Sequence, residues 1–198
     1  MNKAIIFGEK IYFRPLELAD IDDGWLDWVN DWAANRFRDG DIGINRDQLV
    51  EYHTAQKDDA TMLAVCRRRD DRYIGNVRLS SINWVSRSAG YGRLLDPAMR
   101  GQGYGTDSLI QLLRYGFHHL GLNRMWGNMR SHNIMSESSN DKAGMRSEGI
   151  WRQFVYKDGR YWDVVHYAML RDEFDSRHGA PAAWTTFEAE QMGMNFAS

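Results

Sequence analysis

Apolar residues recur at two spacings along the chain, one typical of helices and the other of strands. The spacing i, i+3, i+4, i+7 predicts a first helix over residues 20–34, with four apolar side chains on one face: Trp25, Trp28, Val29 and Trp32. A second apolar stripe predicts the longest helix, over residues 104–120, and Gly121 follows as a helix stop. Two shorter helices are expected over residues 45–57, which start like a capping box, and over residues 133–143.

Runs of apolar and β-branched residues between turn signals predict the strands. They lie at residues 10–15, 61–68, 72–84, 89–95, 123–130, 149–156 and 160–170. The pair Asp158-Gly159 between the last two runs is typical of a hairpin turn. A helix connects the strands at 89–95 and 123–130, and such a crossover makes neighbouring strands parallel. The order predicts an α+β fold with a mixed, mostly antiparallel sheet of about six to seven strands and about four helices.

Composition and charge narrow the functional classes. The chain has 198 residues, enough for one domain with a proper core, and its formal charge of −2 shows no basic excess of the kind that binds nucleic acid. Its single cysteine, Cys66, lies in an apolar run and is expected to be buried rather than nucleophilic. The apolar run at 4–7 is too short for a signal peptide, and no run is long enough to span a membrane. We therefore expect a cytoplasmic protein without a nucleic-acid or membrane partner.

A glycine-rich loop carries the strongest chemical signal. Residues 100–106 read Arg-Gly-Gln-Gly-Tyr-Gly-Thr and join the strand at 89–95 to the helix at 104–120. Alternate glycines let backbone N–H groups approach a ligand, and the helix N-terminus with Arg100 adds positive charge. The loop therefore predicts a phosphate or pyrophosphate site. Its spacing differs from the dinucleotide motif G-x-G-x-x-G, and it lacks the lysine of a nucleotide P-loop, so neither of those sites is expected.

The loop resembles the acyl-CoA signature [QR]-x-x-G-x-[GA] of the GCN5-related N-acetyltransferases (GNAT), with Arg100, Gly103 and Gly105 at the specified positions. Other segments are similar, in the same order, to motifs of the RimJ/RimL branch of that superfamily. They are Phe13-Arg14-Pro15-Leu16 with Asp20, Asn133-x-x-Ser136, Asp141-Lys142-x-Gly144-Met145, Glu148-Gly149, Arg152 and the Asp-Gly-x-x-x-Asp sequence at 158–163. The resemblance covers about residues 9–174. We accordingly expect an N-acetyltransferase domain at residues 1–174 and a C-terminal tail at 175–198.

The resemblance implies a GNAT fold in which the two central parallel strands splay apart around acetyl-CoA, with no metal. The pantetheine arm would pair with backbone groups near Leu94 and Leu95, and Asn133 would bond to the arm or to the adjacent backbone. The pyrophosphate would lie on the glycine-rich loop. The cofactor-binding residues expected there are Arg100, Gly101, Gln102, Gly103, Tyr104, Gly105 and Thr106.

The same resemblance implies direct attack of an amine on the acetyl thioester, without an acyl-enzyme. Many relatives carry a tyrosine as proton donor where this chain has Asn140, so Ser136 becomes the expected donor, beside Asn133. Many carry a glutamate base where this chain has Gly90. Asp163 is our catalytic candidate for the base. The alternatives are His166, Glu148, Tyr91 and a water chain that ends in bulk solvent.

The acceptor is expected to be a primary amine. The resemblance places the first two helices over the acceptor side, and Trp28, Trp32 and Tyr91 are the candidate substrate-binding residues, although the tryptophan stripe could equally pack the helix on the sheet. Acidic residues at 39 and 41 could attract a cationic amine. A small amine, an amino sugar or a nucleotide-linked amino sugar is favoured. A peptide N-terminus, as in RimJ/RimL, and a non-catalytic acyl-CoA-binding module are the alternatives, and a homodimer is left open.

Overall fold

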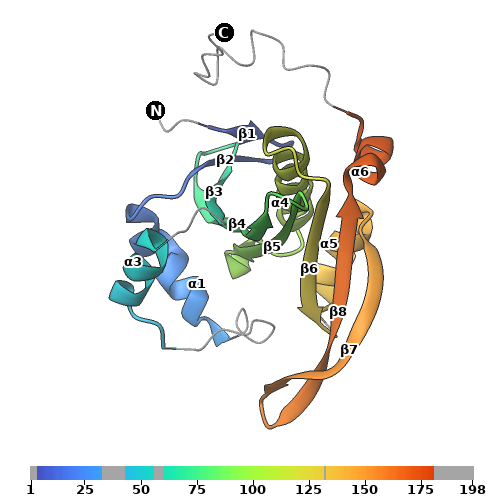
Figure 1. Ribbon diagram of the computed structural model, residues 1–198. Coiled ribbons are helices and arrows are strands. Elements are labelled where there is room, and N and C mark those ends of the chain that lie inside the picture. Colours follow the sequence, from blue (N-terminus) through green and yellow to red (C-terminus); the bar gives the residue numbers. More distant parts are fainter. Residues whose placement is uncertain (1–3, 33–42, 56–59, 132, 181–198) are drawn as a thin grey trace.

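The computed structural model describes residues 4–32, 43–55, 60–131 and 133–180 (Figure 1). An eight-stranded sheet runs through it in the order β1-β2-β3-β4-β5-β6-β8-β7. The strands are β1 (Ile6–Phe7), β2 (Ile11–Pro15), β3 (Thr61–Arg67), β4 (Tyr73–Asn83), β5 (Ser88–Leu95), β6 (Arg124–Arg130), β7 (Arg146–Lys157) and β8 (Arg160–Leu170). The additional strand β1 has two residues, too few for an alternating pattern to reveal it. The predicted α+β class with a mostly antiparallel mixed sheet is confirmed.

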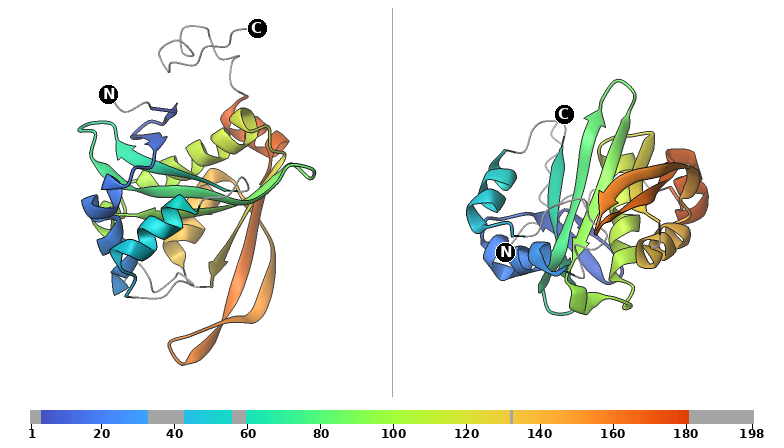
Figure 2. Two further views of the ribbon diagram at one scale, coloured as in Figure 1. Left: turned by 60° about the vertical axis from the view of Figure 1, so that its left-hand side comes forward. Right: turned by 90° about the horizontal axis from the view of Figure 1, so that it is seen from below.

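Helices cover both faces of the sheet (Figure 2). One face carries α1 (Leu26–Asn30) and α3 (Arg46–Thr54), and the other carries α4 (Tyr104–Arg114), α5 (Ile134–Ala143) and α6 (Arg171–His178). Short helical turns, η1 (Ile21–Trp25), η2 (Pro97–Met99) and η3 (Tyr115–His119), join or extend them. A large apolar core lies on the α4 side and a smaller one on the α1 and α3 side. Because both faces are covered, β3 is buried at five successive positions instead of alternating.

The predicted parallel pair, β5 and β6, lies at the centre of the sheet. The two strands pair only over three residues, Ser88–Gly90 opposite Arg124–Trp126. Beyond this point β5 stays paired with β4 and β6 with β8, so the sheet opens between them. The ring of Tyr91 lies in the opening against Gly127, where any Cβ atom would overlap the ring. A glycine at this position is therefore required by the close approach of the two strands.

The first helix differs from the prediction of one regular helix over residues 20–34. The chain kinks at Gly24, which has φ 117°, because the ring of Trp28 lies where a Cβ atom of that residue would be. Helix α1 then ends before Asp31, whose backbone is extended. Trp32 consequently leaves the apolar face and is 60% exposed. The other three members of the predicted stripe are buried: Trp25, Trp28 and Val29.

A buried ion pair fixes the chain where it leaves β2. The guanidinium of Arg14 donates to both carboxylate oxygens of Asp20, at 2.6 and 2.7 Å, and both side chains are almost fully buried. The same carboxylate accepts the backbone N–H of Glu17 at 2.8 Å, which closes the connecting turn. The hydrogen bonds to Asp20 raise the pKa of Arg14 further above its usual range, so the guanidinium keeps its charge although it is buried. This pair sets the direction in which η1 and α1 leave the sheet.

Helix α6 is absent from the elements that the sequence pattern predicts, because its eight residues bury one apolar side chain, Phe174. That ring packs on Phe117 with 5.4 Å between centroids. One turn later, a ring nitrogen of His178 lies 2.9 Å from the carbonyl oxygen of Ala143 at the end of α5. The expected domain boundary after residue 174 therefore falls inside α6. Residues of this helix before and after the boundary contact the rest of the domain.

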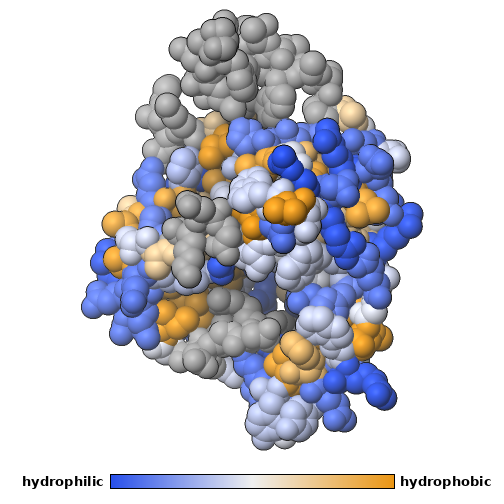
Figure 3. Space-filling view, viewed as in Figure 1, coloured by the Kyte–Doolittle hydropathy of each residue, from blue (hydrophilic) through white to orange (hydrophobic). Residues whose placement is uncertain are grey.

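Strands β7 and β8 form a long hairpin that projects from the body (Figures 1 and 2). Its turn contains the predicted Asp158-Gly159 pair, with φ values of 54° and 76°. Strand β7 is an edge strand, exposed along most of its length. On the face in Figure 3, hydrophobic residues are scattered in small groups among hydrophilic ones, on the hairpin as well as on the body. Within the described residues, no helix is long and apolar enough to cross a membrane.

Replacement of Asp20 by alanine is expected to destabilise the protein by about 3–5 kcal/mol, because it leaves the guanidinium of Arg14 buried without its partner. Urea unfolding of the wild type and Asp20→Ala measures the loss. Asp22→Ala is the matched control, since Asp22 binds Arg46 at 2.8 Å with both side chains about half exposed, and we expect almost no change there. Equal losses in the two variants would contradict the anchoring role of Arg14 and Asp20.

Candidate functional site

A cleft of about 1190 Å³ lies where β5 and β6 separate. Its walls come from β4 and β5, from the glycine-rich loop before α4, from α5, and from η1, α1 and α3 on the opposite side. The cleft is lined by most of the residues that the sequence predicts to bind the cofactor or the substrate or to take part in catalysis. They are Tyr91, Leu94, Leu95, Arg100, Gly101, Gly103, Gly105, Thr106, Asn133 and Ser136. The tertiary structure thus brings together residues from three separate segments of the sequence.

The glycine-rich loop turns sharply into α4. Gly101 and Gly103 have φ values of 73° and 86°, in the left-handed region that glycine adopts without strain. Gly105 has ordinary helical geometry. A Cβ atom there would make only ordinary contacts, 3.5 Å from the hydroxyl oxygen of Ser139 and 3.8 Å from the guanidinium of Arg93, so a larger side chain would enter the cleft. The loop therefore leaves the first turn of α4 open to a ligand.

A second cation, missed by the sequence analysis, lies beside this loop. The ammonium group of Lys10 donates to the carbonyl oxygen of Gln102 at 2.8 Å and lies 3.0 Å from where a Cβ atom of Gly103 would be. Asp107 in the first turn of α4 holds this segment by accepting the backbone N–H groups of Lys10 and Ile11, at 2.7 and 3.2 Å. Lys10 is 92 residues from the loop along the chain, so no local pattern could have associated them.

Two of the expected cofactor-binding residues do not line the cleft with their side chains. The amide group of Gln102 donates to the carbonyl oxygen of Ala98 at 3.0 Å, which closes the turn before α4. The side chain of Tyr104 is 94% buried in the core beneath the loop. Both side chains therefore shape the loop and do not line the cleft.

Asn133 and Ser136 lie at the start of α5. The side-chain oxygen of Asn133 accepts the backbone N–H of Ser136 at 3.3 Å, which is an N-cap bond. Asn133 therefore holds the first turn in place, and Ser136 lies in the cleft lining.

The phenol of Tyr91 in β5 contacts Asn140 of α5, the residue at which the family resemblance would place a tyrosine. The hydroxyl of Tyr91 donates to the side-chain oxygen of Asn140 at 2.9 Å, and Asn140 is fully buried in α5. Burial raises the pKa of Tyr91, so the phenol keeps its proton and cannot serve as a base at neutral pH. The amide nitrogen of Asn140 is buried without a hydrogen-bond partner among the described residues.

None of the other three candidate bases lines the cleft. Asp163 in β8 accepts the backbone N–H of Gln153 at 2.8 Å, where β7 bulges. Glu148 forms an ion pair with Arg124 that lowers the pKa of the carboxylate, and the ring of His166 packs on Trp151. The prediction of Asp163 as a catalytic residue is therefore not supported by its position. Strand alternation predicts only that Asp163 and His166 fall on opposite faces, and it does not give the distance of either from the cleft.

The position of the usual glutamate is filled by an aromatic ring. A Cβ atom on Gly90 would lie 3.1 Å from the indole of Trp126, its parallel partner on β6. A glutamate there would require that ring to move, so the glycine and the tryptophan are complementary.

Most of the tryptophan side chains predicted on the first helix pack in the core, and only one of them lines the cleft. Trp25 lines the cleft and contacts Tyr52 of α3 with 6.2 Å between ring centroids. Trp28 is buried behind it against Tyr73, and neither Trp28 nor the exposed Trp32 belongs to the cleft lining. Both were expected to bind substrate. The kink at Gly24 accompanies the burial of Trp28, and the end of α1 before Asp31 accounts for the exposure of Trp32. The acidic residues expected at 39 and 41 lie outside the described residues.

Two arginines of the cleft escaped the sequence analysis. Arg93 in β5 donates to the carbonyl oxygen of Gly105, and burial lowers its pKa. Arg78 in β4 donates to the hydroxyl of Tyr52. The only available signal was an arginine inside a strand flanked by apolar residues, a pattern that also describes an exposed strand position.

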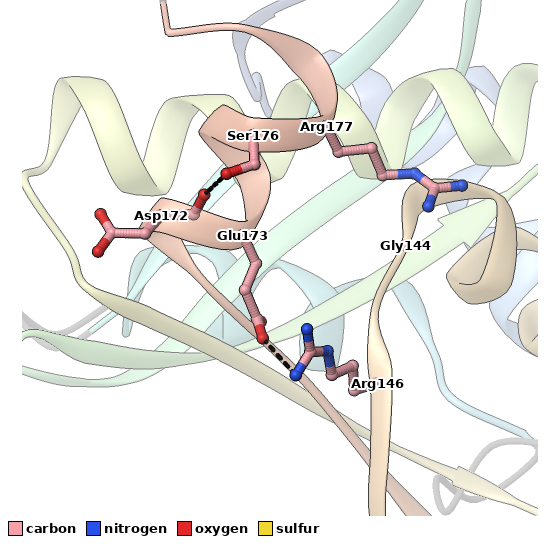
Figure 4. A pocket seen from close by; sticks show the side chains of 6 residues that line it. All are labelled: Gly144, Arg146, Asp172, Glu173, Ser176 and Arg177. Atoms are coloured by element: carbon pink, nitrogen blue, oxygen red, sulfur yellow. Dashed lines mark hydrogen bonds and ion pairs between the residues drawn. The ribbon is translucent and has the colours of Figure 1, made fainter.

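A second cavity, of about 430 Å³, lies between α6 and the start of β7 (Figure 4). Two interactions join polar groups of its lining. Arg146 binds Glu173 at 3.0 Å, and the hydroxyl of Ser176 donates to the carbonyl oxygen of Asp172 at 2.8 Å. It has no open donor set comparable to that of the cleft. Within the part of the chain that the structure describes, no three His, Cys, Asp or Glu side chains gather as a metal-binding group.

The fold and the cleft define the class of an acyltransferase, an enzyme that moves an acyl group between two bound molecules. The chain belongs to the acetyltransferase (GNAT) domain family, whose sequence model matches residues 10–146. It is 30% identical to the probable N-acetyltransferase YjcK of Bacillus subtilis (strain 168), over 84% of this chain and 97% of that protein.

Two further comparisons involve polyamine enzymes. The chain is 26% identical to the spermidine N(1)-acetyltransferase of Vibrio cholerae, over 66% of this chain and 76% of that protein. A crystal structure of the spermidine N-acetyltransferase from Vibrio cholerae, in complex with CoA and spermine, has a TM-score of 0.78 at 22% identity. The match covers 83% of this chain and 98% of that chain. This structural likeness establishes the GNAT fold.

The native protein is expected to be inert towards thiol reagents. Cys66 is fully buried in β3, and burial raises the pKa of its thiol. Ellman's reagent should therefore react with Cys66 only after unfolding in guanidinium, and Cys66→Ala should retain acyl transfer. Rapid labelling of the folded protein, or loss of activity in Cys66→Ala, would instead indicate that the thiol takes part in the reaction.

Proposed function

We propose that this protein transfers the acetyl group of acetyl-CoA directly to a small primary amine, with both substrates bound together and without an acyl-enzyme. The observation that carries the proposal is the continuity of one cleft, from the glycine-rich loop through the opening between β5 and β6 to the α1 and α3 side. A cofactor and an acceptor can meet in such a cleft from opposite faces of the sheet.

The loop half of the cleft suits CoA. Open N–H groups of the first turn of α4, with Arg100 and Lys10 nearby, supply the positive charge that a pyrophosphate requires. Among the described residues, β5 has no partner strand on its β6 side after Gly90. Its backbone groups near Leu94 and Leu95 are therefore available for the amides of a pantetheine arm, which would add to the sheet like a further strand.

The chemistry needs one proton donor and one proton acceptor. The amine nitrogen attacks the acetyl carbon, the carbon–sulfur bond breaks, and the sulfur leaves as a thiolate that takes up a proton, while the nitrogen loses one. We assign the donor role to Ser136, whose hydroxyl lines the cleft, and a positioning role to Asn133, which caps the same turn. The protonated phenol of Tyr91, held by Asn140, is the alternative donor.

The amine proton leaves by water in this proposal. Gly90 and Trp126 exclude a carboxylate from the usual position, and Asp163, Glu148 and His166 lie outside the cleft lining. A water chain to bulk solvent is the remaining route from the sequence analysis. With no base among the described residues of the cleft, only the unprotonated amine can attack. The rate should therefore rise with pH up to the pKa of the acceptor's amine group.

Small amines are the favoured acceptors, in agreement with relatives named for spermidine acetylation. A peptide N-terminus, as in the RimJ/RimL branch, is the second candidate. The motif residues of that branch mostly have structural positions here: Arg14 binds Asp20, and Asp158 forms the hairpin turn. A screen of amines, amino sugars and N-terminal peptides for release of CoA thiol tests the proposal, and absence of release with every amine would contradict it.

Gly105→Val is expected to weaken acetyl-CoA binding at least about tenfold, because the added methyl groups enter the space between Arg93, Ser139 and Leu95. Calorimetric titration with CoA measures the affinity. Gly105→Ala is the graded control, since its Cβ atom makes only ordinary contacts. Gly103→Val would be less informative, because its φ of 86° strains any other residue. Wild-type affinity in Gly105→Val would refute the location of the cofactor.

Ser136→Ala is expected to lower kcat about 100-fold with little change in the KM for acetyl-CoA, since only proton donation to the leaving thiolate is removed. Steady-state kinetics with a good acceptor measures both constants. Ser138→Ala, which removes another hydroxyl of the cleft lining, is the matched control. A large loss of kcat in Tyr91→Phe, with none in Ser136→Ala, would transfer the donor role to Tyr91.

A further inference from the structure

We infer that the acceptor carries an anionic group, a carboxylate or a phosphate, in addition to its amine, and that the guanidinium of Arg78 binds that group. The inference rests on the proposed function, because it names the substrate class of the same cleft. It separates this protein from relatives that are named for spermidine, which is a polycation.

Arg78 lies beside an open hollow in the acceptor half of the cleft. It is directly opposite Gly92 in the register of β4 and β5, one residue from Tyr91, where the sheet begins to open. A Cβ atom on Gly92 would meet no other atom of the described residues within 4 Å, so none of them fills the space above that strand position. Both residues line the cleft. A ligand in the hollow would therefore lie against the guanidinium of Arg78.

The hydrogen-bonding capacity of Arg78 is only partly used. Its guanidinium donates to the hydroxyl of Tyr52, a neutral oxygen, and its carbon lies 5.3 Å from the centroid of the same ring. Its Nε atom is buried and has no hydrogen-bond partner among the described residues. A cation that donates to one neutral oxygen gains most from an anionic acceptor on the side of the guanidinium that faces the cleft. In contrast, Arg14 and Arg124 each bind a carboxylate.

The charge of the cleft lining favours the same conclusion. Among the described lining residues, four are cationic and one is a carboxylate, and that carboxylate belongs to Asp96. It is already bound by Arg72 at 3.0 Å and by the backbone N–H of Ala98 at 2.8 Å. The cations are Arg78, Arg93, Arg100 and Lys142.

These cations divide between the two faces of the sheet. Arg100 lies on the glycine-rich loop and Lys142 on α5, on the side expected for the CoA phosphates, and Arg93 contacts the same loop. Arg78 contacts α3 on the other face, where the acceptor would enter. Of the described residues in that half, Arg78 would present a like charge to spermidine and an opposite charge to an anionic amine.

Matched pairs of acceptors test the inference. They are an amino acid with its amide, and glucosamine 6-phosphate with glucosamine, and spermidine provides the polycation. We expect the anionic member of at least one pair to have the higher kcat/KM by about tenfold or more. The pair that shows the preference distinguishes a carboxylate from a phosphate. A wild-type enzyme that prefers spermidine or the neutral members would overturn the inference and leave the proposed function intact.

Arg78→Met keeps the bulk of the side chain and removes its charge. We expect it to abolish the preference through a 10- to 100-fold higher KM for the anionic acceptor, with the KM for acetyl-CoA unchanged, and Arg78→Lys to retain part of the preference. Arg152→Met, which removes an exposed cation outside the cleft lining, is the control for a general loss of positive charge. A higher KM for acetyl-CoA in Arg78→Met would assign Arg78 to the cofactor instead and overturn the inference.

Binding gives a second measurement that does not need turnover. Calorimetric titration of the same acceptor pairs into the wild type and Arg78→Met, with CoA present, reports the charge preference directly. If no amine releases CoA, the proposed function fails, yet a charge preference lost in Arg78→Met would still support the anionic ligand. Equal binding of charged and neutral members to the wild type would overturn it.

Discussion

The structure depends on the point at which two parallel strands stop pairing. Strands β5 and β6 share three paired residues and then follow different neighbours, β4 and β8. Close contacts fix that point, because the ring of Tyr91 fits against Gly127 and the indole of Trp126 fits against Gly90. The opening connects the two faces of the sheet in one cleft. Catalysis by positioning two substrates becomes possible because the opening is built into the sheet.

Each face is attached to this opening by one dominant polar contact. On the cofactor side, Asp107 in α4 accepts backbone N–H groups of the chain entering β2 and so holds Lys10 at the glycine-rich loop. On the acceptor side, the buried pair of Arg14 and Asp20 fixes the exit from β2 towards α1. Both contacts involve β2. This short strand therefore holds both halves of the site in position, although none of its residues lines the cleft.

The charge of the described lining residues distinguishes this cleft from one that would suit a polyamine. Common descent with spermidine acetyltransferases is compatible with a different acceptor, because specificity resides in a few side chains and the fold is shared. The described lining has its only carboxylate already bound, and the acceptor side offers the guanidinium of Arg78 instead. The base is likewise absent from its usual position, which makes the protonation state of the incoming amine part of the specificity.

Periodicity and turn residues by themselves determined most helices and strands, the parallel pair and the glycine-rich loop, because these depend on contacts between near neighbours in the sequence. The family resemblance pointed to Ser136 and Asn133 through a short motif, which can also be read from a local stretch of sequence. The tertiary structure alone decided that Trp32 leaves the apolar face, that Asp163 lies outside the cleft, that Lys10 lies beside the glycine-rich loop and that Arg78 lines the cleft. These outcomes depend on a kink, a bulge and contacts between distant segments, and local patterns contain no information about such long-range packing.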